Sequence, residues 1–232
     1  MAIELIILAG GFGSRMNSIN KGTPKALMPV GDYIYLDFLL TKAIKYNVNH
    51  FFISLHYKSD LFIEYINNSK MYNMLTPIIE PEPLGTGGAI NYVIQNSLIS
   101  SPFFSINGDS LSDINFDQMV DDFEKQNFMA VLGISKVDNA YRYGTVVEKD
   151  GVVLSFNEKG VKGNEWVNNG HYIFKKEAFD GYSGVFSLEN DLFPKLIQNQ
   201  ELGVFKVAND NFIDMGIPED YEKLCDMYEV IK

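Results

Sequence analysis

Short apolar runs alternate with stretches of helical periodicity through the first 140 residues of the chain. The apolar runs have the length and composition of buried strands. The stretches between them place apolar residues three and four positions apart, as on one face of a helix. We predict strands over Ile3–Leu8, Phe51–Leu55, Thr76–Ile79, Phe103–Asn107 and Ala130–Ser135. We predict helices over Tyr35–Tyr46, Asp60–Asn67, Gly87–Ile94 and Phe116–Gln126.

This alternation predicts an α/β fold with a largely parallel sheet covered by helices on both faces. In such sheets, ligands bind at the carboxyl ends of the strands. The loop after Leu8 and the loop after Asn107 each follow a buried apolar strand. We therefore expect these two loops to lie on the same edge of the sheet.

After residue 140 the pattern changes to shorter strand candidates. The dipeptide Asp150-Gly151 predicts a tight turn between the first two of them. The predicted strands are Gly144–Glu148, Val152–Phe156, His171–Phe174, Val204–Val207 and Phe212–Asp214, with a helix over Leu188–Gln198 and a last helix from Pro218. Since no linker, low-complexity segment or internal repeat interrupts the chain, we predict one domain over residues 1–232.

Composition and charge limit the classes of function. The 232 residues carry a formal net charge of -11, which argues against general binding to nucleic acid or an anionic membrane, because such binding depends on a basic face. The single cysteine, Cys225, forms no internal disulfide and fits a reducing compartment. No run approaches the length of a membrane span, and Ile3–Ala9 is too short for a signal peptide. We expect a cytoplasmic protein.

The first strand runs into a glycine-rich loop that carries an arginine, and a lysine follows. Glycines allow the backbone to approach a phosphate closely, and cations neutralise its charge. The loop contains Gly10, Gly11, Gly13 and Arg15, with Lys25 further on. It is not a dinucleotide-binding fingerprint, because the third glycine position is Met16, and the chain lacks the Gly-Lys-Ser or Gly-Lys-Thr of a P-loop.

Two acidic residues follow predicted strands, and the first of them, Asp109, is a candidate ligand of Mg²⁺, a hard ion that takes carboxylate and phosphate oxygens. Asp109 ends the Asn107-Gly108-Asp109 sequence, and Asp214 precedes a turn that opens the helix from Pro218. Taken alone, the Asn107-Gly108-Asp109 sequence is more typical of an ordinary turn than of a metal site, and Asp214 is typical of a turn or a helix cap. The glycine-rich loop on the same edge of the sheet favours the metal at Asp109.

These motifs resemble those of the sugar-1-phosphate nucleotidyltransferases, over nearly the whole chain from Leu8 to Tyr221. The resemblance implies a Rossmann-like, three-layer α/β/α fold of the GT-A-like type with a mainly parallel mixed sheet. Residues 1–140 would be mainly the nucleotide-binding half and residues 141–232 mainly the sugar-phosphate-binding half. Segments 83–90, 142–146 and 212–221 look most like the D-glycero-α-D-manno-heptose 1-phosphate guanylyltransferases of bacterial surface-polysaccharide synthesis.

The resemblance also implies roles for individual residues. Arg15 would hold the β and γ phosphates of a nucleoside triphosphate, and Lys25 would bridge the α phosphate and the incoming sugar phosphate. Asp109 and Asp214 would hold Mg²⁺. The nucleotide would be bound by Leu8, Ala9, Gly10, Gly11, Gly13, Glu80, Gly85, Thr86, Asn107 and Gly108. The sugar phosphate would be bound by Tyr143, Gly144, Glu158, Lys159, Asn168 and Gly170.

In the related enzymes the position of Glu80 contacts the base. A carboxylate only accepts hydrogen bonds, so it matches the two adjacent N–H donors of guanine and favours GTP over UTP or CTP. Glu82 is a competing candidate for this role, and a solvated loop acid is the alternative for Glu80.

Other functions stay open at this point. A catalytically silent relative would bind nucleotide sugar and regulate a partner. An acceptor such as choline phosphate would need an aromatic cage, for which Tyr141, Tyr143 and Trp166 are available. The sequence leaves the oligomeric state open, with a homo-oligomer among the options.

Overall fold

A computed structural model describes residues 3–13, 22–157, 163–207 and 212–231 of the chain, with side chains described as far as residue 227 in the last helix. Three candidate site residues, Arg15, Glu158 and Lys159, lie outside the described residues. Within these ranges, no helix is long and apolar enough to cross a membrane.

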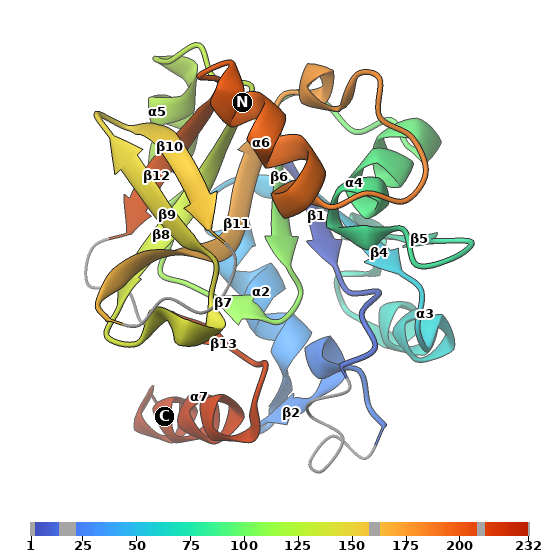
Figure 1. The fold of residues 1–232 in the computed structure, drawn as a ribbon. Helices are drawn as coiled ribbons and strands as arrows, with labels where there is room; N and C mark the ends of the chain where they lie inside the picture. Colours follow the sequence, from blue (N-terminus) through green and yellow to red (C-terminus); the bar gives the residue numbers. More distant parts are fainter. Residues whose placement is uncertain (1–2, 14–21, 158–162, 208–211, 232) are drawn as a thin grey trace.

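Within the described ranges, nine strands form one mixed sheet in the order β5-β4-β1-β6-β11-β8-β12-β10-β9 (Figure 1). Strands β5, β4, β1 and β6 are parallel, and β8 and β12 are parallel. Strand β11 is antiparallel to both β6 and β8. The strands are β1 Ile3–Leu8, β4 Val48–Leu55, β5 Leu75–Ile79, β6 Phe103–Asn107, β8 Ala130–Val137, β9 Thr145–Lys149, β10 Val152–Asn157, β11 Glu165–Phe174 and β12 Leu202–Val207.

Helices cover both faces of this sheet. Alternate residues of a strand point to opposite faces, and in β1 Leu5 and Ile7 pack in one core cluster while Ile6 packs in another. The first cluster contains residues of α2, α3, α5 and α7, and the second contains residues of α4 and α6. The helices are α2 Tyr35–Ile44, α3 Ser59–Asn68, α4 Gly85–Asn96, α5 Phe116–Glu124, α6 Phe193–Gln198 and α7 Pro218–Ile231. The predicted three-layer α/β/α arrangement is confirmed.

Two short strand pairs lie outside the main sheet. Strands β2, Pro29–Val30, and β3, Tyr33–Ile34, pair as a hairpin. Strand β7, Ser110–Leu111, pairs antiparallel with β13, Ile213–Asp214, so that Asp214 is opposite Ser110. Figure 1 shows this second pair beneath the carboxyl end of β6, with α7 beyond it.

The first half of the chain follows the sequence prediction closely, and the differences lie later. β1 and β6 have the predicted bounds. β11 begins at Glu165, whereas the sequence pattern predicted a start at His171. Residues 168–170 interrupt the apolar pattern of this strand, so the pattern did not indicate its first half. The pairing of β11 with β8 shifts register at the same place. The predicted helix Leu188–Gln198 is a π-helical turn, Leu188–Leu192, followed by α6 with a proline in its first turn.

The turn and loop placements agree with expectation. Asp150 and Gly151 both have positive φ, 53° and 85°, as the turn between β9 and β10 requires. Leu8 and Asn107 are direct partners in the parallel pairing of β1 with β6. The glycine-rich loop and the Asn107–Asp109 loop therefore leave the sheet at the same edge.

Candidate active site

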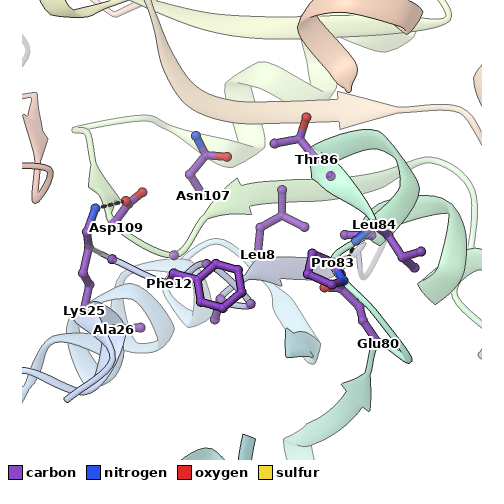
Figure 2. A pocket seen from close by; sticks show the side chains of 17 residues that line it. Leu8, Phe12, Lys25, Ala26, Glu80, Pro83, Leu84, Thr86, Asn107 and Asp109 are labelled. Atoms are coloured by element: carbon purple, nitrogen blue, oxygen red, sulfur yellow. Dashed lines mark hydrogen bonds and ion pairs between the residues drawn. The ribbon is translucent and has the colours of Figure 1, made fainter. Parts of the chain in front are cut away.

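A cavity of about 380 Å³ opens at this edge of the sheet. Every described residue that the family resemblance assigns to the nucleotide lines it, together with Lys25 and Asp109. Figure 2 shows Lys25 and Asp109 at one end of the cavity and Glu80 with Leu84 at the other, with Leu8 between them. The structure thus brings the predicted nucleotide-binding residues together from segments at β1, α4 and β6.

Backbone contacts explain why small residues line this cavity. The N–H of Gly108 donates to the carbonyl oxygen of Leu8 at 2.9 Å. A Cβ at Gly108 would lie 2.7 Å from that same oxygen, and a Cβ at Gly10 would lie 3.0 Å from Oε1 of Glu80. Side chains at these positions would force β1 and β6 apart at their carboxyl ends or displace Glu80.

Lys25 and Asp109 form an ion pair in the cavity. Lys25 begins a 3-10 turn after Pro24, and its Nζ donates to Oδ2 of Asp109 at 2.7 Å. The two side chains are 17% and 33% exposed, so water and substrate can reach both. The ion pair therefore holds the ammonium group of Lys25 beside Asp109, just after the end of β6.

Glu80 is buried, with only 6% of its surface exposed. Its Oε1 accepts a hydrogen bond from Oγ of Ser54 at 2.8 Å, and its Oε2 accepts one from the N–H of Leu84 at 3.2 Å. The alternative of a solvated loop acid is therefore wrong. The competing Glu82 is exposed and lies outside the lining of this cavity.

A second cavity, of about 560 Å³, adjoins the first and shares Lys25, Asn107 and Asp109 with it. Three of the residues predicted to bind the sugar phosphate line it. They are Tyr143, Gly144 and Asn168. The N–H of Asn168 donates to the carbonyl of Gly144 at 3.0 Å, which joins β11 to the 142–146 segment.

Gly170 is outside the lining of the second cavity but supports residues that form it. Its φ is 78°, a conformation that favours glycine. A Cβ there would lie 2.7 Å from Nδ2 of Asn107 and 2.9 Å from Oγ of Ser110. We assign Gly170 to the positioning of these two polar side chains.

The pairing of β7 with β13 brings the two candidate metal ligands together. The N–H of Met215 donates to the backbone oxygen of Asp109 at 2.8 Å, and Asp214 is opposite Ser110. Burial, and after it the charge of Asp109, raise the pKa of the Asp214 carboxyl from 3.8 to about 6. A divalent cation between the two carboxylates would offset this repulsion.

The two carboxylates are a donor set that is compatible with a divalent cation such as Mg²⁺. No group of three or more His, Cys, Asp or Glu side chains gathers around a metal position in the described ranges. Mg²⁺ is usually held by one or two carboxylates, with waters and substrate phosphates completing the shell. Asp109 and Asp214, both in the lining of the second cavity, supply that number of carboxylates.

Three further polar residues lie at the site without having been predicted. Arg142 lines the second cavity and donates from Nη2 to Asp220 at 2.5 Å, while its buried Nη1 has no hydrogen-bond partner among the described residues. The phenol of Tyr35 is buried, and burial and the charges of Asp109 and Asp214 raise its pKa. Glu189 lines the second cavity and accepts from Thr86. For Arg142 the signal was its place in a chain with only two arginines, whereas Tyr35 and Glu189 read as ordinary helix residues.

Two of the three aromatic residues that the sequence offered for a quaternary ammonium cage lie outside the lining of the second cavity. Tyr141 lines a separate hollow with Asp138, Asn139 and Gly163. The ring of Trp166 is approached by Lys136 at 5.9 Å and Lys206 at 5.6 Å. Of the three candidates, Tyr143 alone lines the second cavity. The geometry therefore disfavours a cage built from Tyr141, Tyr143 and Trp166.

Comparison with known proteins identifies the class. The model of the nucleotidyl transferase family matches residues 4–229, and the chain belongs to this family. It is therefore a nucleotidyltransferase enzyme, and the alternative of a catalytically silent relative is set aside.

Particular relatives are similar over nearly their full length. The D-glycero-α-D-manno-heptose 1-phosphate guanylyltransferase of Aneurinibacillus thermoaerophilus is 33% identical over 95% of this chain and 96% of its own. The enzyme of that name from Campylobacter jejuni is 31% identical over 94% and 97%. The crystal structure of HddC from Yersinia pseudotuberculosis complexed with GMP-PN has a TM-score of 0.84 at 32% identity, over 97% and 99%. The resemblance stated from the sequence motifs is confirmed.

Gly170 and Gly181 provide a matched pair of substitutions. Both have positive φ, 78° and 83°, but an added Cβ meets nothing within 4 Å at Gly181. Alanine should cost about 1 kcal/mol of stability at Gly181, from backbone strain alone, and more at Gly170, where the Cβ also clashes with Asn107 and Ser110. Gly170→Ala should also lower turnover, measured as pyrophosphate release, by up to about 100-fold, because it displaces Asn107 and Ser110. Equal turnover in the two variants would contradict the role given to Gly170.

Asp214 leads to a prediction on pH. Because the folded state raises the pKa of this carboxyl from 3.8 to about 6, the folded protein keeps a proton in this interval that the unfolded chain has released. The contribution of Asp214 to the free energy of unfolding is therefore greatest at low pH and is lost as the pH rises through about 6. In urea unfolding of the metal-free protein, the free energy of unfolding should fall more between about pH 4 and about pH 7 in the wild type than in Asp214→Asn. The same loss in both proteins would show that Asp214 is not the group responsible.

Proposed function

We propose that this enzyme transfers GMP from GTP to a sugar 1-phosphate, D-glycero-α-D-manno-heptose 1-phosphate, and releases pyrophosphate. The product would be a nucleotide-activated sugar for bacterial surface-polysaccharide synthesis. The observation that carries the proposal is the pair of adjoining cavities that share Lys25, Asn107 and Asp109. A donor nucleotide in one and an acceptor in the other would meet at these three residues.

The reaction suits this arrangement. An oxygen of the sugar phosphate attacks the α phosphorus, a new P–O bond forms, and the bond from the α phosphorus to the β-phosphate oxygen breaks as pyrophosphate leaves. Both reactants are anions, so catalysis consists mainly of alignment and charge neutralisation. Lys25, in the lining of both cavities, is positioned to contact the α phosphate and the acceptor phosphate together.

The acidic residues complete the charge balance. Asp109 and Asp214 would hold Mg²⁺, which when bound offsets negative charge at the reacting phosphorus. The ion pair of Lys25 with Asp109, 2.7 Å long, keeps the ammonium group beside these acids. The role proposed for Arg15, at the departing pyrophosphate, concerns a residue outside the described ranges.

Glu80 supports guanine as the base. Its two oxygens each accept one hydrogen bond, from Ser54 and from the N–H of Leu84, which fixes the orientation of the carboxylate. A carboxylate offers about four accepting positions, so each oxygen can accept one more. Guanine presents two adjacent N–H donors on its pairing edge and matches this arrangement. The complex of HddC with GMP-PN and the names of the similar guanylyltransferases add to this support.

The second cavity supports a sugar phosphate as the acceptor. Asn168 and Gly144 line it with the cations Lys25 and Arg142, so that it combines groups for hydroxyls with groups for a phosphate. Such polar groups select substrates that carry the matching hydroxyls. The choice of heptose rests on the names of relatives that are 31% and 33% identical.

Pyrophosphate release over the four common nucleoside triphosphates and a set of sugar 1-phosphates tests the proposal. The set contains the α-1-phosphates of the heptose, mannose, glucose and N-acetylglucosamine. With Mg²⁺ present, kcat/KM should be highest for GTP with the heptose 1-phosphate. A preference for UTP, CTP or dTTP would overturn the assignment of guanine, and a preference for another sugar would overturn that of heptose.

Glu80→Gln tests how the base is recognised. The amide replaces an accepting oxygen with a donor, so kcat/KM for GTP should fall by about 10- to 100-fold, the usual cost of losing a hydrogen bond to a charged group. Glu82→Gln removes the same charge two positions away on an exposed residue and is the matched control. A larger loss in Glu82→Gln would transfer the role to Glu82. Thermal unfolding of both variants checks that the buried site still folds.

A further inference from the structure

The turn Leu188–Leu192 connects the two cavities physically. Phe186, just before it, accepts hydrogen bonds from the N–H groups of Gly87 and Gly88, both at 3.1 Å, at the start of α4. A Cβ at Gly87 would lie 2.3 Å from the ring of Phe186, so the glycine allows this close contact. The turn is thereby seated on the helix that borders the nucleotide cavity.

Within this turn, the carboxylate of Glu189 is hydrogen-bonded to Thr86, a residue that lines the nucleotide cavity. Its Oε2 accepts from Oγ1 of Thr86 at 2.9 Å and from Oγ of Ser187 at 2.7 Å. Thr86 lines the nucleotide cavity and also accepts from the N–H of Leu188 at 2.9 Å. The hydrogen bonds from Thr86 and Ser187 to Glu189 both end on Oε2, and a carboxylate has accepting positions on both of its oxygens. Glu189 therefore has the capacity to accept from a further donor.

Glu189 also lines the second cavity, together with Asn168. The Nδ2 of Asn168 donates to the phenol oxygen of Tyr172 at 2.8 Å. After burial, the negative charge of Glu189 is the largest cause that raises the pKa of Tyr172. Glu189 and Asn168 thus supply polar groups to the same cavity as the two cations Lys25 and Arg142.

A carboxylate in this position has a definite chemical preference. It repels a phosphate, and it accepts strongly from hydroxyl groups. The same cavity holds Lys25 and Arg142 for the phosphate end of an acceptor. An acceptor with its phosphate at the cations therefore presents its sugar hydroxyls toward Asn168 and Glu189.

We propose that Glu189 accepts a hydrogen bond from a hydroxyl of the acceptor sugar and selects for that hydroxyl, while Thr86 and Ser187 hold its carboxylate in place. This inference rests on the proposed function and adds a specificity-determining residue to it. The role belongs to binding of the acceptor, because the reacting phosphates lie at Lys25 and Asp109.

Glu189→Gln is the direct test. The amide oxygen still accepts from Thr86 and Ser187, so the turn keeps its contacts, but the other oxygen becomes a donor. With D-glycero-α-D-manno-heptose 1-phosphate, KM for the acceptor should rise by about 10- to 100-fold, and KM for GTP should change by less than about twofold. Glu177→Gln removes one acidic charge from an exposed residue outside both cavities and should match the wild type.

Acceptor analogues that each lack one hydroxyl identify the contact. With the wild type, one analogue should have a kcat/KM about tenfold or more below that of the complete acceptor. With Glu189→Gln, the same analogue should react almost as well as the complete acceptor, because the substitution and the missing hydroxyl remove the same interaction. Fully additive losses for every analogue, or an equal rise in KM for GTP, would overturn the inference. If Glu189→Gln lowers the melting temperature, Glu189→Asp, which keeps the charge but withdraws it, replaces it in the same comparison. Wild-type protein inactive with every sugar 1-phosphate would instead refute the proposed function.

Discussion

The parallel pairing of β1 with β6 is the constraint on which the site depends. Leu8 is opposite Asn107, so both strands end at one edge, and the N–H of Gly108 donates to the carbonyl of Leu8 at 2.9 Å. This hydrogen bond holds the glycine-rich loop against the Asn107–Asp109 loop. A shift of pairing by one residue would turn the buried side chains of a strand to the opposite face. Burial on both faces of the sheet therefore fixes the position of the catalytic loops.

Charge is distributed around this edge in a way that suits two anionic substrates. The chain has a net charge of -11, yet Lys25 is held beside Asp109, and Arg142 lines the adjoining cavity. Asp214 arrives from the other end of the chain through the pairing of β13 with β7. The elevated pKa of Asp214, about 6, reflects the cost of placing two carboxylates together where burial removes water. A divalent cation bound to both carboxylates would offset this cost.

The residues proposed to select the base and the sugar lie at the ends and irregular positions of elements rather than within the central strands. Glu80 follows β5, Asn168 lies where β11 shifts register against β8, and Glu189 lies in a π-helical turn. Bulges and π turns insert residues that ordinary strands and helices do not need, and they frequently occur beside active sites. Here they direct polar side chains into cavities bordered by rigid strands. One sheet can thus serve different bases and sugars with changes confined to a few positions.

The sequence by itself determined the strands and helices of the first half, the glycine-rich loop after the first strand and the motifs that identify the family. These features are local: each is encoded in the spacing of residues within about ten positions. Only the tertiary structure decided that Glu80 is buried and oriented by Ser54, that β11 begins at Glu165, and that Gly170 supports Asn107. It alone revealed Glu189 between the cavities, because Thr86 lies 103 residues away in the chain. Contacts between distant segments follow from how the layers pack, and no local pattern of residues records them.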